Sequence, residues 1–265
     1  MAINIIVCVK PVPASDNVTI DTTTKTVRRS ASESVISTLD KNALELAAQL
    51  KKQEDCNVTV LSMAPAASAE KCIREAMARG GDKAVILSDR AFAGGDTFAT
   101  SYALSCAIKH IGGVDLIITG AASDDGGTGQ LPVQLAEWLG IQHLHNASSV
   151  KLNGNKLTVE TKADGQMLNW ECDLPALISV NRSINSVGPV SVRNIVAAAR
   201  KELTVLSAAN LPELDTGRIG LKNSPTQNGE LYPIDGSRSG KIIEGDDETL
   251  ANEIITRLSA VGITL

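Results

Sequence analysis

The stretch LIITGAASDDGGTGQLPVQL, residues 116–135, contains a strand, a glycine-rich loop and the start of a helix. Residues 116–119 form a short aliphatic run that is typical of a strand buried on both faces. Helical spacing of apolar residues then runs from about Gln130 to Leu139 and stops at Gly140. A buried strand followed directly by a loop and a helix is the repeating unit of a parallel α/β sheet.

The same alternation recurs through the first half of the chain. Aliphatic runs predict further buried strands at residues 3–9, 58–63 and 84–87. Helical spacing of apolar residues predicts helices at residues 41–50, 67–79 and 97–110. Asp40 and Asp96 are the candidate N-caps of the first and third of these helices. We therefore predict an α/β fold with a mostly parallel, doubly wound sheet.

One connection is unusual, because the link between the first strand and the first helix far exceeds the ~2–6 residues that are common. Residues 18–21 and 27–29 predict a hairpin across the polar turn at 22–25. This insertion favours a decorated first crossover over a tight phosphate loop.

The second half has a different pattern. Residues 150–152, 157–161 and 167–171 predict antiparallel strands, with a turn at Asn153 and Gly154, and residues 175–180 predict another buried strand. Residues 207–265 are rich in proline and glycine and end in a short helix with an apolar side, formed by Leu250, Ile254, Ile255 and Leu258. We expect an α/β core over 1–206 with a small antiparallel addition, and an extended C-terminal arm over 207–265. The arm either leans on another chain or folds over its own domain.

Composition and charge exclude several classes of protein. Apolar residues are 43% and charged residues 21% of the chain, so a core can form. A net charge of −5 and only two residues each of Phe, Tyr and Trp argue against nucleic-acid binding. We expect no membrane insertion, because no apolar run approaches the ~20 residues of a bilayer span.

Cysteines and histidines give no metal or hydrolytic site. The five cysteines are scattered without a C-x-x-C pair, and no secretory signal precedes them, so we expect a reduced, cytoplasmic protein. His143 and His145 have no third ligand nearby in the sequence, and we expect no metal. G-x-S-x-G and H-E-x-x-H motifs are absent, so a binding or carrier role fits better than hydrolysis.

Two loops are candidate binding sites. Ligands of parallel sheets bind beyond the carboxyl ends of the strands, which nominates the segments that start at Cys8, Met63 and Gly120. The loop of residues 120–130 offers glycines, Thr128 and a helix N-terminus, which together suit a phosphate or pyrophosphate. The loop of residues 92–101 repeats this pattern at a second helix. The alternatives are a flexible turn in the first loop and simple helix capping by Asp96 in the second.

Several blocks of the sequence, in order, resemble the β subunit of electron-transfer flavoproteins. The blocks are IIVCVKPVP (5–13), LDKNALE (39–45), LSMAP (61–65), LSDRAFAG (87–94), DGGTGQ (125–130), SVRNI (191–195) and GLKNSP (220–225). The resemblance covers nearly the whole chain. It implies an adenine-nucleotide α-hydrolase-like core and a heterodimer with an α subunit that carries its own FAD, embraced by the arm of the β subunit.

The resemblance also implies cofactors and site residues. Ordinary members hold a structural AMP in the β core, whereas electron-bifurcating members hold a second FAD that exchanges a hydride with NAD(H). The implied nucleotide contacts are Cys8, Ser37, Thr38, Leu39, Asp40, Met63, Gly120, Ala121, Ala122, Ser123, Asp124, Asp125, Gly126, Gly127, Thr128, Gly129, Gln130 and Leu131, with Asp96, Thr97 and Thr100 near the flavin's pyrophosphate in the bifurcating type. Backbone donors of Gly126, Gly127 and Thr128 would hold the pyrophosphate, and Asp40 or Asp125 would meet ribose or adenine.

A surface segment is implied to dock a flavin dehydrogenase of the acyl-CoA dehydrogenase or FAD oxidase type, through Val192, Arg193 and Ile195. Val192 stands where the family usually has leucine, and Ala197 to Ala199 replace a lysine-rich run. These differences indicate either a particular partner or neutral variation.

The nucleotide loop also departs from the family pattern. Ala122 replaces a glutamine, Gly127 an acid and Pro132 a glycine, so the identity of the nucleotide stays open. Our first hypothesis is a bifurcating β subunit with FAD. The alternatives are a β subunit with structural AMP and a stand-alone adenine-nucleotide sensor.

Overall fold

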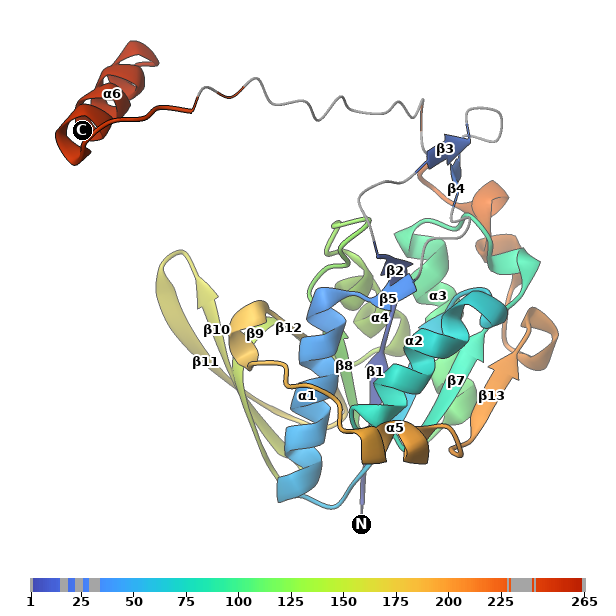
Figure 1. Ribbon diagram of the computed structural model, residues 1–265. Helices are drawn as coiled ribbons and strands as arrows, with labels where there is room; N and C mark the ends of the chain where they lie inside the picture. The colour runs from blue at the N-terminus through green and yellow to red at the C-terminus, as the bar shows by residue number, and fades with distance from the viewer. Residues whose placement is uncertain are drawn as a thin grey trace. The chain divides into compact units, whose positions relative to one another are not determined.

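The computed structural model describes residues 2–14, 19–21, 26–28, 34–227, 229, 240 and 242–263, with the backbone alone for 19–21 and 26–28. In these residues the main sheet has nine strands in the order β11-β10-β9-β12-β8-β1-β6-β7-β13 (Figure 1). The strands are β1 (Ile3–Cys8), β6 (Cys56–Met63), β7 (Lys83–Leu87), β8 (Leu116–Gly120), β9 (Gln142–Asn153), β10 (Lys156–Ala163), β11 (Gln166–Asp173), β12 (Ala176–Val180) and β13 (Leu203–Leu206).

Most of this sheet is parallel. Every neighbouring pair from β9 to β13 is parallel, whereas β10 is antiparallel to both β9 and β11. The prediction of a mostly parallel sheet with a small antiparallel addition is therefore confirmed. Two smaller antiparallel pairs lie in the first crossover: β2 (Pro11–Pro13) with β5 (Ser34–Ile36), and β3 (Thr19–Asp21) with β4 (Thr26–Arg28). The second pair confirms the predicted hairpin strands, and the turn between them lies outside the described residues.

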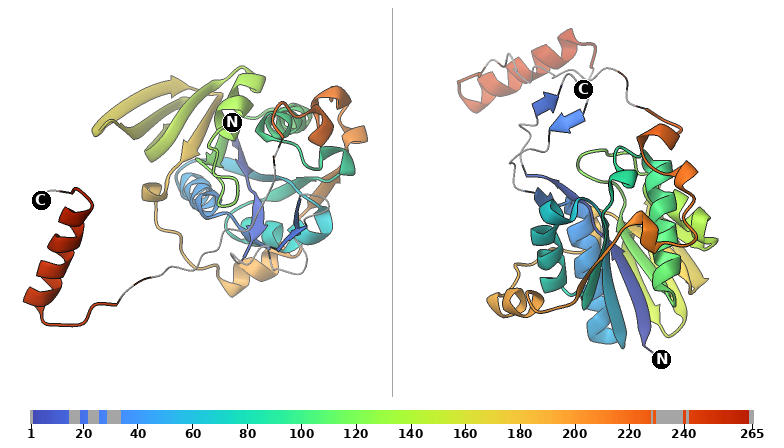
Figure 2. Two further views of the ribbon diagram at one scale, coloured as in Figure 1. Left: turned by 90° about the horizontal axis from the view of Figure 1, so that it is seen from above. Right: turned by 90° about the vertical axis from the view of Figure 1, so that its right-hand side faces the viewer.

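Helices cover both faces of the sheet (Figures 1 and 2). One face carries α1 (Thr38–Gln53), α2 (Ala66–Ala78) and α5 (Val192–Ala198), and the other carries α3 (Thr97–Ile111) and α4 (Leu131–Leu139). None of the described helices is long and apolar enough to cross a membrane.

The central strand β1 shows why both faces are covered. Ile5 and Val7 pack in the core beneath α1 and α2, whereas Ile6 and Cys8 pack in the core beneath α3 and α4. Because successive side chains of a strand point to opposite faces, an uninterrupted aliphatic run requires a layer on each side. Burial of each such side chain stabilises the fold by about 1.5–3 kcal/mol.

Most of the predicted helix ends are confirmed. The Asp96 carboxylate accepts a hydrogen bond from the Ala99 N–H at 3.0 Å and caps α3. α4 ends at Gly140, whose φ of 67° is the left-handed conformation that glycine adopts without strain. α1 differs from the prediction because it begins at Thr38, after Ser37, so Asp40 lies inside the first turn and is not the N-cap.

Two parts of the main sheet were missed by the sequence analysis. β9 begins at Gln142, and its first half pairs with β12, so the antiparallel addition continues directly from the parallel sheet. β13 pairs with the edge of β7. The first half of β9 has no aliphatic run and contains His143 and His145, whereas β13 is apolar but has only four residues.

Residues 207–227 are part of the first of two compact units of the chain, residues 1–230. Leu211 and Ile219 are buried in the core beneath α3, and the Tyr102 hydroxyl accepts a hydrogen bond from the Asp215 N–H at 2.9 Å. Short 3₁₀ turns lie at Ala208–Asn210, Thr216–Arg218 and Leu221–Asn223. This part of the arm thus folds over its own domain, the second of the two arrangements considered. The boundary after residue 206 stays a prediction.

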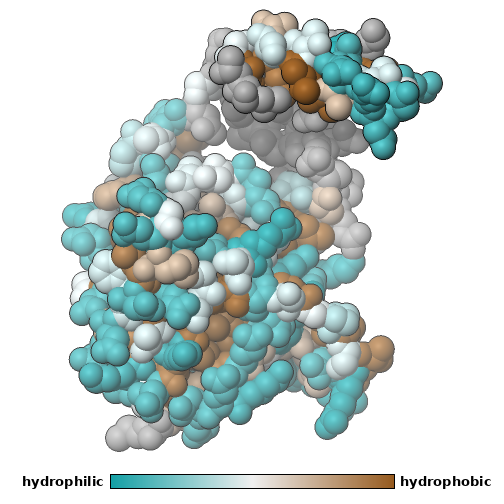
Figure 3. Space-filling model, turned by 90° about the vertical axis from the view of Figure 1, so that its left-hand side faces the viewer, coloured by the Kyte–Doolittle hydropathy of each residue, from teal (hydrophilic) through white to brown (hydrophobic). Residues whose placement is uncertain are grey.

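Residues 231–265 form a second unit, whose described helix is α6 (Asp247–Ala260). The Asp246 carboxylate caps this helix by accepting a hydrogen bond from the Thr249 N–H at 2.9 Å. None of the helix residues is buried, and Ile254 and Ile255 are about half exposed. Apolar side chains therefore lie on the surface of α6 (Figure 3).

Candidate nucleotide-binding site

The candidate site lies at the carboxyl ends of the central strands. β1 pairs in parallel with both β6 and β8, so Cys8, Met63 and Gly120 end their strands at the same edge of the sheet. We call this the carboxyl edge. The helices α1, α3 and α4 begin there, and their N-terminal N–H groups carry the partial positive charge that attracts anions.

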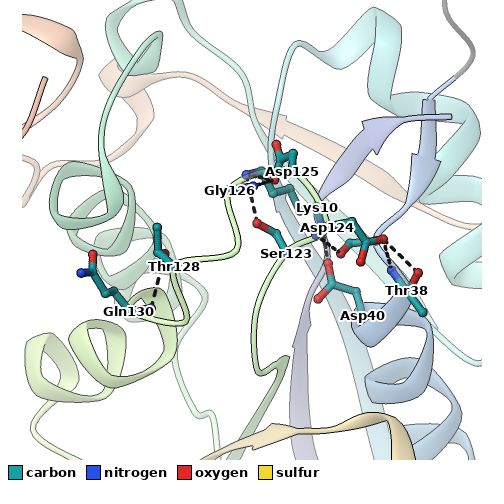
Figure 4. Close-up of polar contacts among 10 residues, drawn as sticks. Lys10, Thr38, Asp40, Ser123, Asp124, Asp125, Gly126, Thr128 and Gln130 are labelled. Carbon is teal, nitrogen blue, oxygen red and sulfur yellow. Dashed lines mark hydrogen bonds and ion pairs between the residues drawn. The ribbon is translucent and has the colours of Figure 1, made fainter. Parts of the chain in front are cut away.

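Asp40 connects three elements at this edge. Its carboxylate accepts hydrogen bonds from the Lys10 N–H at 2.8 Å and from the Gly120 N–H at 3.2 Å (Figure 4). Position 120 requires glycine, because a Cβ there would lie 2.6 Å from Asp40 Oδ1 and 2.8 Å from Leu39 Cβ. Asp40 therefore fixes the ends of β1 and β8 against α1.

Burial perturbs two titratable groups here. Burial raises the pKa of Asp40 from 3.8 to about 7, although the hydrogen bonds from Lys10 and Gly120 oppose the rise. Burial, with a smaller contribution from Asp40, raises the pKa of the Cys8 thiol to about 12. Cys8 is thus a neutral packing group, not a nucleophile.

Asp124 occupies the N-terminus of α1. Its carboxylate accepts hydrogen bonds from the Thr38 N–H at 2.7 Å and from the Thr38 hydroxyl at 2.9 Å. The Asp124 N–H in turn donates to the Ser37 hydroxyl at 3.1 Å. A residue 86 positions further along the chain therefore caps this helix, and the α1 N-terminus is already neutralised by the protein's own carboxylate.

Asp125 is neutralised by Lys10. The Lys10 Nζ lies 2.7 Å from Asp125 Oδ1 and 3.4 Å from the Ser123 hydroxyl. Burial alone would raise the pKa of Asp125, but the hydrogen bonds from Lys10 and Ser123 hold it below its ordinary value. Both acidic residues of the loop are thus paired within the protein. Without these pairs their negative charges would oppose the binding of an anion in this loop.

The loop leaves a small set of backbone donors for a ligand. The Gly126 N–H donates to Asp125 Oδ1 at 2.7 Å, and the Gly127 N–H donates to the Ser123 carbonyl at 2.9 Å. Two of the three expected pyrophosphate donors are therefore used inside the loop. Among the described residues, the N–H groups of Thr128 and Gly129 have no hydrogen-bond partner.

The second predicted loop meets the first. The Thr97 hydroxyl donates to Gln130 Oε1 at 2.9 Å, which brings the start of α3 next to the start of α4. Asp96 faces away from this contact: besides capping α3, it accepts hydrogen bonds from the Thr226 N–H at 2.9 Å and the Thr226 hydroxyl at 2.6 Å. Burial alone would raise the pKa of Asp96, but the hydrogen bonds from Ala99 and Thr226 keep it below its ordinary value. The N–H of Thr100 donates to the Asp96 carbonyl within the first turn of α3.

Two buried hydroxyls near the carboxyl edge were missed by the sequence analysis. Ser62 Oγ and Thr119 Oγ1 lie one residue before the ends of β6 and β8, and neither has a hydrogen-bond partner in the described part of the chain. Buried polar atoms are rarely left unpaired. The signal was available in the sequence, since each is a hydroxyl residue within an otherwise aliphatic run.

The remaining predicted residues lie away from the carboxyl edge or contribute only backbone atoms to it. Ala121 is buried, and its N–H donates to the Val180 carbonyl in β12, whereas Ala122 and Leu131 are partly exposed. Val192, Arg193 and Ile195 lie on α5, which packs on α2, far from the carboxyl edge (Figure 1). His143 and His145 both contact the Ser179 hydroxyl, and no cluster of three metal-ligating side chains occurs in the residues the structure describes.

Fold and site together define a class. A doubly wound sheet with free loop amides and adjoining helix N-termini at its carboxyl edge has the architecture with which α/β proteins bind nucleotide phosphates. Residues 24–211 match the family model described as "Electron transfer flavoprotein domain". The chain belongs to the electron transfer flavoprotein family.

Curated relatives match the sequence of this chain over most or almost all of its length. The chain is 37% identical over 258 residues to "Electron transfer flavoprotein subunit beta" of Thermoanaerobacterium thermosaccharolyticum, covering 97% of this chain and 98% of that protein. It is 34% identical to the protein of the same name from Megasphaera elsdenii, covering 97% and 98%. It is also 36% identical over 230 residues to "Protein FixA" of Azorhizobium caulinodans, covering 84% and 82%.

Proposed function

We propose that this chain is the β subunit of an electron-transfer flavoprotein that holds FAD at the carboxyl edge and pairs with an α subunit bearing a second FAD. In this proposal bound FAD would supply hydride exchange with NAD(H), and electrons would pass through the α-subunit FAD to a flavin dehydrogenase. Bound FAD would supply the redox chemistry, and the protein would bind it, orient it and exclude water. The names of the relatives support the α partner and flavin involvement.

The observation that best supports a dinucleotide as the ligand is the hydrogen bond between Thr97 and Gln130. It places two helix N-termini side by side, whereas the third, at α1, is filled by Asp124. A diphosphate has two anionic groups, and two adjoining helix N-termini would face them: the start of α4, which has no side-chain cap, and the start of α3, which the Asp96 carboxylate caps. Thr128 and Gly129 would bind one phosphate through their N–H groups, and the first turn of α3 would face the other.

The alternative nucleotide is AMP, as a structural ligand without NADH chemistry. It is favoured by the small number of free loop amides, since those of Gly126 and Gly127 are already used. A single phosphate at Thr128 and Gly129 would need no contribution from α3. A stand-alone nucleotide sensor is a weaker candidate, because the relatives match over nearly the whole chain under names of flavoprotein subunits.

The docking surface is proposed to be α5. Val192 and Ile195 are 76% and 54% exposed, which is unusual for large apolar residues on a short helix. Apolar anchors with an adjacent arginine are the residue types that carry binding energy in protein interfaces. α5 and the carboxyl edge lie at opposite ends of the sheet, so a dehydrogenase anchored on α5 would not touch a nucleotide at the carboxyl edge.

The test is the ligand content of the native αβ complex. Denaturing release followed by mass spectrometry and absorbance should give two FAD per αβ pair. One FAD and one AMP per pair would refute the bifurcating form and support the alternative. An adenine nucleotide bound by a monomer that forms no αβ complex would refute both.

A further inference from the structure

The docking helix α5 is weakly anchored by apolar contacts. It has seven residues, and Ala198 is the one buried side chain among them. Isolated helices of this length are unstable in water. The position of α5 on the surface of the core must therefore depend on other contacts.

Arg74 on α2 holds the C-terminal end of the α5 segment. Its Nη1 donates hydrogen bonds to the carbonyls of Ala198 at 3.1 Å and Lys201 at 2.9 Å. Glu70, one turn earlier on α2, lies 3.4 Å from the Arg74 guanidinium and orients it. Hydrogen bonds from a charged donor are roughly twice as strong as neutral ones.

Arg79, just beyond the end of α2, holds the other end. Its Nη1 donates to the Gly188 carbonyl at 3.0 Å, while Nε and Nη2 bind Glu75 at 2.9 and 2.8 Å. The Arg79 side chain is only 12% exposed. The two arginines thus donate hydrogen bonds to backbone carbonyls before α5, at residue 188, and at its C-terminal end, at residues 198 and 201.

A pocket open to solvent lies beside this segment, so part of α5 has no close-packed neighbour. It has a volume of about 500 Å³ and lies between α1, α2 and residues 188–201, with Lys52, Arg79 and Lys201 in its lining. Lys201 spans part of it, since its Nζ donates to the carbonyls of Met77 at 3.2 Å and Gly81 at 2.6 Å. α5 packs on α2, but the side of α5 that borders this pocket is not held in place by close packing.

We infer that Arg74 and Arg79 are positioning residues for dehydrogenase docking, which fix the segment of residues 188–201 on either side of α5 so that the exposed apolar side chains of α5 meet the partner in one orientation. This inference rests on the proposed function of α5 as the docking surface. A pre-ordered surface binds more tightly because less conformational entropy is lost on association. A guanidinium can bind a glutamate and a carbonyl at the same time, a geometry that a lysine ammonium reproduces poorly.

The experiment uses the αβ complex with Arg74→Gln and Arg79→Gln, each with its charge-conserving partner, Arg74→Lys and Arg79→Lys. Lys52→Gln is the matched control, because it removes a positive charge from the same pocket without a described hydrogen bond to the segment. Three quantities are measured: hydrogen exchange of the amides of residues 192–201, steady-state electron exchange with a purified acyl-CoA dehydrogenase, and reduction of an artificial dye. Dye reduction by the complex reports activity that needs no docking.

The glutamine variants should exchange these amides faster and raise the apparent KM for the dehydrogenase roughly tenfold, with kcat and dye reduction unchanged. The lysine variants should fall between wild type and glutamine, and Lys52→Gln should match wild type. A KM within twofold of wild type in the glutamine variants, or unchanged exchange, would overturn the inference. If a glutamine variant does not fold, its lysine counterpart decides by the same criteria.

Ile195→Ala separates this inference from the proposed docking role. If Ile195→Ala raises KM and the arginine variants do not, the positioning role is wrong and docking on α5 stands. If Ile195→Ala leaves KM unchanged as well, the docking role itself is wrong, and the inference falls with it. A wild-type complex that exchanges no electrons with this dehydrogenase refutes the proposed partner class and the docking inference together.

Discussion

The buried carboxyl group of Asp40 should make the stability of this chain fall as the pH rises from 5 to 8. Its pKa is raised to about 7 in the folded chain, chiefly by burial, from an ordinary value of 3.8. A raised folded-state pKa means that the native state binds more protons than the unfolded state between these two values. The contribution to stability is therefore complete below pH 3.8 and is lost progressively until the pH passes 7.

The size of the effect follows from the shift. The difference between 3.8 and about 7 corresponds to about 4 kcal/mol in total, of which about 2–3 kcal/mol falls between pH 5 and pH 8. Asp40→Asn removes this titration. It also leaves one of the Lys10 and Gly120 N–H groups without an acceptor, which costs about 1–3 kcal/mol at every pH.

The assay is urea unfolding of the nucleotide-free chain, followed by tryptophan fluorescence at pH 5 and pH 8. Asp40→Asn should be clearly less stable than wild type at pH 5, and the gap should close by about 2–3 kcal/mol at pH 8. Asp89→Asn is the control, because hydrogen bonds from Ala91 and Ala208 lower the pKa of Asp89, so its titration lies below this range. A stability difference between Asp40→Asn and wild type that is the same at both pH values would refute the reasoning.

Three further predictions address the binding loop, the arm and the buried thiol. Gly127 has a φ of 61°, a conformation that asparagine and aspartate tolerate best among the other residues. Gly127→Asp should therefore bind nucleotide about 5- to 30-fold more weakly than Gly127→Asn at low salt, because the added charge repels the phosphate by about 1–2 kcal/mol. Equal affinities of the two variants in equilibrium titration would exclude the loop from the site. Tyr102→Phe should lower the free energy of unfolding by about 1 kcal/mol, because the Tyr102 hydroxyl forms hydrogen bonds with the Asp215 N–H and the Glu213 carbonyl. An unchanged urea midpoint would mean that these hydrogen bonds to the arm contribute nothing to stability. Cys8, with a pKa of about 12, should resist thiol reagents at pH 8 in the folded chain and react after unfolding, and rapid labelling of the native chain would contradict its burial.

The layered fold could be predicted because its signals are local. The aliphatic run of β1 requires cover on both faces, and Gly140 and Asp96 mark helix ends through their own backbone and side-chain chemistry. β13 and the first half of β9 were missed because their pairing partners, not their own residues, make them strands. The first half of β9 is polar and β13 has only four residues, so neither gives a clear periodic signal.

The structure brings many of the predicted residues to the carboxyl edge, but the contacts that they make there differ from those predicted. Asp40 was predicted as a helix cap, and instead it binds the Gly120 N–H, 80 positions away in the sequence. The true cap of α1 is Asp124, from the loop after β8. Contacts between segments so distant depend on how the sheet is assembled, and spacing along the chain does not record them.

The pairing of the loop acids shows the same limit. Two adjacent aspartates next to a proposed phosphate site read as a conflict in the sequence, because both add negative charge. The fold removes the conflict by placing Asp125 against Lys10 and Asp124 on the α1 N-terminus. The prediction of an anion site thus depended on a strand and a helix that the loop itself does not contain.

The most direct test is a crystal structure of the αβ complex purified with its natural ligand. The phosphate nearest the β8–α4 loop should lie within hydrogen-bond distance of the Thr128 and Gly129 N–H groups, with a second phosphate facing the start of α3 if the ligand is FAD. Density for a nucleotide elsewhere on the chain, or a carboxyl edge filled only by protein side chains, would contradict the account.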